Sequence, residues 1–105
     1  MLKKGDWCKH FKGITLDEKN IYVILETEVT YSGDNSRVPL MNLVVYKNVF
    51  QNRIFVRELE DLIAELTKEK QEIYGQIHRV DKLTKEELDY IKKKLSSNKI
   101  DLELS

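Results

Sequence analysis

The sequence predicts a mainly β protein with α additions, namely a small antiparallel barrel or rolled sheet of about five strands followed by a C-terminal helix. Its 105 residues are enough for one domain, and 41% hydrophobic with 34% charged residues is typical of soluble globular proteins. Short runs of β-branched and aromatic residues fill the N-terminal two thirds, and a capped helix follows them. We therefore expect a single domain, with residues 1–83 as the β-barrel part and residues 84–105 as a helix and tail packed on it or extending from it.

Two strands are predicted in the N-terminal part of the chain. The segment GDWCKHFKG (5–13) predicts a first strand that ends in a turn at Gly13. In IYVILETEVTY (21–31) the odd-numbered residues are mostly apolar. Tyr22 and Ile24 add apolar character at one end of the other side, whereas Glu26 and Glu28 make its far end polar. This change indicates a strand that leaves a closed sheet for an exposed hairpin. Residues 31–39 are rich in turn-forming types and predict a surface loop.

Two further strands are predicted in the middle of the chain. MNLVVYKNVF (41–50) and RIFVREL (53–59) are both rich in β-branched and aromatic residues. Gln51 and Asn52 lie between them and suit a tight hairpin turn, although neither is the glycine that such turns favour.

The region after these strands is rich in charged residues. Leucine and isoleucine at helical spacings predict a short helix over 60–66. Residues 72–80 are compatible with two structures. Ile73 and Ile77 fit a helix, whereas Gly75 and the β-branched content favour a strand.

A final helix is predicted over 83–97. Thr84 and Glu87 have the spacing of a capping box, and three lysines at 92–94 suit the last turn of a helix. One apolar stripe runs along the helix and consists of Leu88, Ile91 and Leu95. The tail alternates apolar residues, which predicts an added edge strand or a frayed end; these residues are Ile100, Leu102 and Leu104.

Charge and cysteine content exclude several classes of protein. The 18 acidic and 18 basic residues balance, so the chain lacks the overall basic surplus of most nucleic-acid-binding proteins, while a local basic patch stays open. One cysteine allows no intramolecular disulfide, which favours a reducing, cytoplasmic location. The N-terminal MLKKGDW lacks the apolar run of a signal peptide, and no segment approaches the ~18 apolar residues of a membrane span. We expect a cytoplasmic protein without a membrane partner.

Four segments of the predicted sheet occur in an order shared with a known family. They are GDWCKHFKG, IYVIL, NLVVYKN and FVRELEDL. The segments resemble the small bacterial domain family known as domain of unknown function 1653, whose members show aromatic-x-H-[FY]-K-G, Y-x-V, L-V-V-Y and W/F-V-R-P-L-E-x-F blocks. The matching residues are His10, Phe11, Lys12 and Gly13, then Tyr22 and Ile24, then Leu43, Val44, Val45 and Tyr46, and finally Phe55, Val56 and Arg57 with Leu59 and Glu60.

The resemblance covers roughly residues 5–83, where HRVDKL (78–83) is similar to the family's closing Y-R-F-E-K-I. It implies an SH3-like β-barrel and no established activity, so it supplies no catalytic residues. Three features depart from the family pattern. Glu58 stands where the family usually has proline, Cys8 and Lys9 precede the histidine, and the turn around Gly33 is longer.

Cys8 and His10 form the arrangement that most suggests chemistry. On a strand they project to the same face, two residues apart. A zinc site would need further ligands, and the chain offers only His78 and carboxylates, with no second cysteine. A nucleophile pair would need an oxyanion-binding or orienting motif, which the sequence lacks. We therefore expect a buried thiol, a hydrogen-bonded histidine, no catalytic residue, no metal, no cofactor and no enzymatic activity.

Aromatic residues on the predicted strands indicate a binding surface, although most of these rings are expected in the core. Small barrels commonly bind peptides or nucleic acids across an exposed aromatic groove with a basic rim. The N-terminal segment is locally basic, with four lysines against one aspartate in residues 1–12. The candidate ligand-binding residues are Trp7, His10, Phe11, Lys12, Tyr46 and Arg57.

The function favoured by these observations is a non-catalytic binding or adaptor module that recognises a peptide, a protein or a nucleic-acid segment through one barrel face. A protein or peptide partner is preferred to nucleic acid. The alternative is a homo-oligomeric structural protein, such as a homodimer formed through the C-terminal helix, and an enzyme using Cys8 and His10 is the third interpretation. One structural hypothesis accompanies them: a polar interaction between His10 and Arg57 joins the first and fourth strands and closes the barrel.

Overall fold

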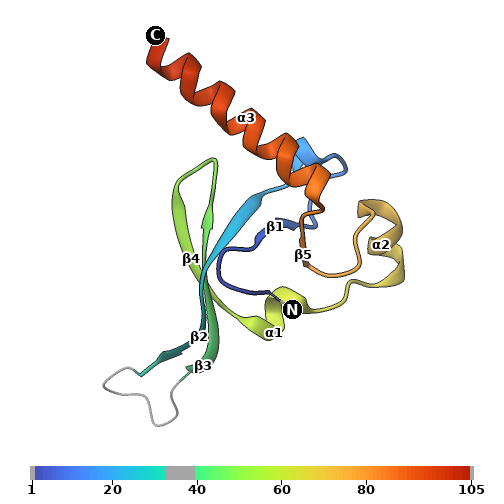
Figure 1. Ribbon diagram of the computed structural model, residues 1–105. Coiled ribbons are helices and arrows are strands. Elements are labelled where there is room, and N and C mark those ends of the chain that lie inside the picture. Colours follow the sequence, from blue (N-terminus) through green and yellow to red (C-terminus); the bar gives the residue numbers. More distant parts are fainter. Residues whose placement is uncertain (1, 33–39, 105) are drawn as a thin grey trace.

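A five-stranded antiparallel sheet forms the body of the protein (Figure 1). The computed structural model describes residues 2–32 and 40–104, with side chains in 2–32 and 41–97. The strands follow the order β4-β3-β2-β1-β5 across the sheet. Their bounds are Trp7–His10 for β1, Ile21–Tyr31 for β2, Leu40–Asn48 for β3, Arg53–Glu58 for β4 and Val80–Lys82 for β5. The predicted fold class, a mainly β protein with a C-terminal helix, is confirmed.

The sheet is open, so the closed barrel, one of the two predicted forms, is wrong. Among the described residues, β4 and β5 lie at opposite edges and do not pair. β4 runs directly into the short helix α1 (Leu59–Ile63), which contacts both edge strands. After α1, the Ala64 oxygen accepts a 2.9 Å hydrogen bond from the Arg79 nitrogen, and the Leu66 nitrogen donates a 2.8 Å bond to the Ile77 oxygen. The segment from α1 to Leu66 therefore lies between β4 and β5 and takes the place of direct pairing between these two strands.

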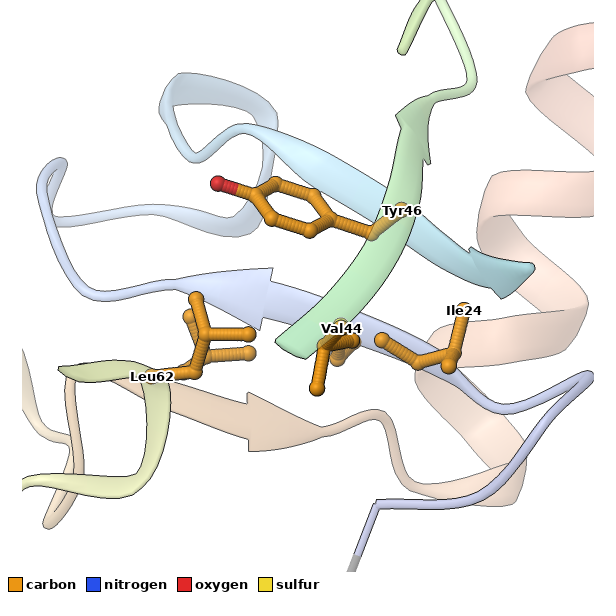
Figure 2. Close-up of a cluster of buried hydrophobic side chains, with 6 residues drawn as sticks. Ile24, Val44, Tyr46 and Leu62 are labelled. Atoms are coloured by element: carbon orange, nitrogen blue, oxygen red, sulfur yellow. The ribbon is translucent and has the colours of Figure 1, made fainter. Parts of the chain in front are cut away.

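The sheet buries side chains on both faces. One face, called the inner face below, carries a cluster made of Cys8, Ile24, Val44, Tyr46, Leu62 and Val80 (Figure 2). On the outer face, Ile21 packs with Leu83 and Ile91. β2 contributes to both clusters because residues an odd number apart along a strand point to opposite faces. The sequence also places the apolar residues Tyr22 and Ile24 on the other side of 21–31, and Ile24 is fully buried there.

β2 and β3 continue beyond the other strands as a two-stranded ribbon (Figure 1). The register between them shifts at three places from Ile24 to Tyr31, and Glu28 and Asn42 have positive φ angles of 56° and 59°. Such bulges bend a strand and increase its twist. The ribbon confirms the predicted exposed hairpin, while most of the predicted surface loop at 31–39 lies outside the described residues.

The turn between β3 and β4 is longer than predicted. β3 ends at Asn48, and the turn covers residues 49–52 instead of Gln51 and Asn52 alone. The side-chain oxygen of Asn48 accepts hydrogen bonds of 3.0 Å from the backbone nitrogens of Phe50 and Gln51. Asn52 adopts a φ of 56°, a left-handed conformation that asparagine reaches more easily than most residues. Asparagine thus closes the hairpin without a glycine.

The structure resolves the two possibilities for residues 72–80. Helix α2 (Lys68–Tyr74) ends at Gly75, whose φ of 63° terminates the helix. After Gly75 the chain makes an isolated β-bridge between His78 and Glu65, and β5 begins at Val80. The helix therefore accounts for the first part of the segment and β-pairing for its end. α1 occupies only the first part of the predicted helix at 60–66, and a short 3-10 helix, η1 (Leu16–Glu18), lies between β1 and β2.

The C-terminal helix α3 (Lys85–Leu104) begins as predicted and ends later than predicted. The Thr84 nitrogen donates to the Glu87 carboxylate at 3.0 Å and the Glu87 nitrogen to the Thr84 hydroxyl at 3.2 Å, which confirms the capping box. The predicted stripe packs on the outer face of the sheet through Ile91, with Leu88 and Leu95 beside it. The predicted strand or frayed tail after residue 97 is wrong, because no glycine or proline interrupts the helix there. The end of α3 extends away from the sheet (Figure 1).

The Lys19 side chain is buried and joins three segments of the chain. Its ammonium donates hydrogen bonds to the carbonyl oxygens of Phe11 at 2.7 Å, Gly13 at 2.6 Å and Tyr74 at 3.2 Å. The same nitrogen lies 5.9 Å from the centre of the Tyr74 ring. Lys19 therefore connects the turn that follows β1 to the end of α2.

We predict that Lys19→Met lowers the free energy of unfolding by at least about 2 kcal/mol, because three carbonyl oxygens lose a charged donor. Lys12→Met is the matched control, since Lys12 is exposed, and its effect should stay within about 0.5 kcal/mol. Urea unfolding followed by circular dichroism measures both values. Equal stability of the two variants would contradict the structural role of Lys19.

We predict a similar contrast between two glycines with positive φ. A Cβ atom on Gly13 (φ 107°) would lie 2.7 Å from the Glu18 backbone oxygen, whereas a Cβ atom on Gly5 (φ 91°) has no neighbour within 4 Å. Gly5→Ala should therefore cost only the backbone strain, about 1–2 kcal/mol, and Gly13→Ala should cost clearly more. Thermal unfolding of both variants checks the order, and a Gly13→Ala protein as stable as Gly5→Ala would contradict it.

Candidate functional site

A pocket of about 120 Å³ opens on the inner face of the sheet, between the two edge strands. Every strand contributes to it, and α1 lines it as well. The lining residues are His10 from β1, Tyr22 from β2, Tyr46 from β3, Phe55 and Arg57 from β4, Asp61 and Leu62 from α1, and Arg79 and Val80 at β5. The pocket exists because the sheet does not close: its side chains come from both edges and from the helix between them.

Three aromatic rings form the apolar part of the pocket. The Tyr22 and Tyr46 rings meet edge to face with centroids 4.8 Å apart, and the Tyr46 and Phe55 rings stack at 5.6 Å. Burial raises the pKa of both tyrosines, so their hydroxyl groups stay neutral hydrogen-bond donors near pH 7. The Tyr46 hydroxyl points away from Ile24 in the core cluster (Figure 2).

Two arginines give the pocket its charge. Arg57 lies on β4 opposite Val44, and its side chain is exposed. The backbone of Arg79 is held on both sides, since its oxygen accepts a 2.9 Å bond from the Phe11 nitrogen and its nitrogen bonds to Ala64. Within the described part of the chain, neither guanidinium takes part in an ion pair. Two cations thus face one carboxylate, Asp61, in the lining of the pocket.

Gln76 places Arg79 at the pocket. Gln76 is buried, and its amide nitrogen lies within hydrogen-bond distance of the carbonyl oxygens of Lys9 at 3.0 Å, His78 at 3.0 Å and Arg79 at 3.4 Å. These bonds tie the turn before β5 to the backbone of β1. The position of Arg79 next to His10 therefore depends on the backbone and on one amide side chain.

His10 is uncharged in this pocket. Burial, together with the nearby positive charges of Lys12, Arg79 and Arg57, lowers its pKa to about 4. The ring accepts a 3.3 Å hydrogen bond from the Lys12 nitrogen at Nδ1, which leaves Nε2 as the protonated position of the neutral ring. His10 can therefore donate one hydrogen bond to a ligand without adding charge.

Cys8 lies on the same strand as His10 and belongs to the core. Its exposed fraction is 1%, and burial raises the pKa of the thiol to about 12. A nucleophilic cysteine requires the opposite shift, towards the thiolate. Among the residues with described side chains, no group of three possible ligands gathers into a metal site. Cys8 is thus a buried apolar side chain in this fold.

The structure brings together three of the six candidate ligand-binding residues, His10, Tyr46 and Arg57. The other three lie elsewhere. Trp7 packs on the outer face beneath α3, Phe11 is buried against Tyr74, and Lys12 is exposed outside the pocket. Sequence reasoning missed Tyr22, Phe55, Asp61, Leu62, Arg79 and Val80. Strand alternation could have indicated Phe55, because it lies two residues from Arg57 on the same face.

The predicted polar interaction between His10 and Arg57 is not formed among the described residues. Both residues line the pocket, but among the described hydrogen bonds none joins them, and the Arg57 charge disfavours protonation of His10. The two side chains line the same pocket and do not join the first and fourth strands.

Comparison of the chain with protein-family models, curated proteins and solved structures gives no match. The resemblance to domain of unknown function 1653 stays a prediction. Within the described ranges, no helix is both long and apolar enough to cross a lipid bilayer.

We predict that His10 titrates near pH 4 in the folded protein and near 6.5 when unfolded. Above pH 6.5 the ring is neutral in both states. Between 6.5 and 4 only the unfolded chain takes up the proton, so His10 lowers the stability as the pH falls through this range. NMR titration of the ring signals measures the pKa, with His78→Gln used for assignment.

Arg79→Gln should raise the pKa of His10 because it removes one of the repelling charges. Lys93→Gln is the control, since Lys93 lies exposed on α3 and does not line the pocket. A His10 pKa that stays the same in Arg79→Gln would contradict the arrangement of charges in the pocket.

Proposed function

We propose that the protein is a non-catalytic binding module whose inner-face pocket holds an anionic oxygen group, a carboxylate or a phosphate, of a larger ligand. The observation that supports this function most directly is the convergence of Arg57 and Arg79 on one pocket, neither in an ion pair within the described residues. Two tyrosines and an uncharged histidine also line this pocket. Arginine binds planar anions through two parallel hydrogen bonds.

The size of the pocket supports recognition of a single chemical group. Pockets that enclose whole drug-sized ligands measure roughly 300–1,000 Å³, whereas this pocket measures about 120 Å³. The rest of the ligand therefore lies outside, along the surface. A peptide or protein segment with an anionic side chain fits this arrangement, and the ring cluster supplies apolar contact beside the charge.

Two observations favour a binding module over the other two interpretations. The stripe that suggested a second copy packs inside the chain, where Ile91 is 1% exposed. The thiol that suggested an enzyme has a pKa of about 12 and is buried in the core. We place the module in the cytoplasm, where a single cysteine stays reduced.

Titration with acetate and with inorganic phosphate tests the proposal. We expect saturable chemical-shift changes at His10, Arg57 and Arg79, with dissociation constants in the millimolar range because the pocket is open to water. Arg57→Gln or Arg79→Gln should each weaken binding about tenfold, since each removes a charged donor. Lys93→Gln removes the same charge far from the pocket and should leave binding unchanged. If all three variants weakened binding equally, the anions would be attracted by the overall charge of the protein and not by the pocket, which would contradict the proposal.

A further inference from the structure

The edge strand β4 presents two further features beside the pocket. It pairs with β3 on one side only, so the backbone groups on its other side have no strand partner among the described residues. Its residues also alternate in character. Arg53, Phe55 and Arg57 occupy one face, where the Arg53 guanidinium lies 5.6 Å from the Phe55 ring, and the opposite face exposes Ile54 and Val56.

From these features, and resting on the proposed function, we propose that the ligand is an acidic peptide segment that adds to β4 as an extended strand. One acidic side chain of the peptide enters the pocket at Arg57 and Arg79, and a second, four residues away, meets Arg53. A peptide strand rises about 3.3 Å per residue, so residues four apart span about 13 Å, the same spacing as Arg53 and Arg57 on β4. Backbone pairing with an open edge supplies affinity, and alternate side chains supply specificity.

Charge decides between a peptide and a second copy of this chain. Two copies joined antiparallel at β4 by a two-fold axis would keep their inner faces on the same side, so the arginine row of one would lie beside that of the other. Arg53 and Arg57 also form no ion pair within the described structure. An acidic strand satisfies both guanidinium groups, whereas a second copy opposes them.

The probe is a blocked seven-residue peptide with glutamate at its second and sixth positions, valine at its fourth and threonine elsewhere. The control peptide has the same composition, with its glutamates at the second and fifth positions, so that only one can face the arginine row. With the full chain, the first peptide should bind about tenfold more tightly, because the control loses one charge-assisted contact. Amide signals of β4 should shift on binding.

Two variants separate this inference from the proposed function. Arg53 lies outside the pocket, so Arg53→Gln should weaken the first peptide and leave acetate binding unchanged. Arg79→Gln should weaken both. Circular dichroism confirms that each variant folds. Loss of acetate binding in Arg53→Gln would overturn the division of roles between the two arginines.

N-methylation tests the backbone pairing. Two versions of the first peptide carry methyl groups on alternate amides, so one set faces β4 and the other faces solvent. We expect one version to lose binding and the other to keep it. Equal binding of both methylated versions would overturn the strand addition, and so would equal binding of the two glutamate arrangements. In either case the pocket proposal stands if acetate and phosphate still bind. Failure of acetate and phosphate to bind overturns the pocket itself. A dimer that forms through β4 in sedimentation, without preference for the first peptide, overturns the inference in favour of a second copy.

Discussion

The buried ammonium of Lys19 is the interaction on which the position of the pocket depends. The ammonium donates hydrogen bonds to the carbonyl oxygens of Phe11 and Gly13, which follow β1. It also donates to the carbonyl oxygen of Tyr74, which lies 55 residues after Lys19 in the chain. Burial of a charge costs free energy and therefore lowers the pKa of Lys19, and the three hydrogen bonds to its ammonium offset that cost. Phe11 directly follows His10 in the chain. Tyr74 lies two residues before Gln76, whose side chain is within hydrogen-bond distance of the Arg79 carbonyl oxygen. The pocket therefore has a rigid side, built from β1 and the approach to β5, that does not depend on closure of a barrel.

The charged side chains on the open edge of β4 have two consequences. Unpaired edge strands attract other strands, and proteins commonly protect them with short length and charged side chains. β4 is short and carries Arg53, Arg57 and Glu58, so a neutral or basic strand gains little by pairing with it. The same arginines lie on the face of the pocket, where an acidic strand satisfies them. Under the proposed strand addition, the same side chains would discourage a neutral or basic strand and favour an acidic one.

Local patterns in the sequence were enough to predict the strands β1 to β4, the capping box and the C-terminal helix. The capping box depends on two residues three apart, and β2 depends on an alternation within one segment. The pocket depends on residues from all five strands, so only half of the candidate residues could be chosen correctly. Arg79 illustrates the limit: its place is set by Phe11, Ala64 and Gln76, and no spacing in the sequence connects these residues. Closure of the sheet was equally out of reach, because it depends on where α1 packs.

The charge arrangement that keeps His10 neutral also supports the proposed binding of an anion in the pocket. Arg57 and Arg79 lower the pKa of His10 because they repel a further positive charge. An anion between them cancels that repulsion, so the pKa of His10 must rise when the pocket is occupied. By thermodynamic linkage, protonation of His10 must then strengthen binding by the same free energy. The coupling stays small near pH 7, because a pKa near 4 leaves almost no protonated ring to recruit. In the proposed complex, affinity at neutral pH would therefore come mainly from the two arginines, with His10 as a neutral donor and Cys8 buried in the core.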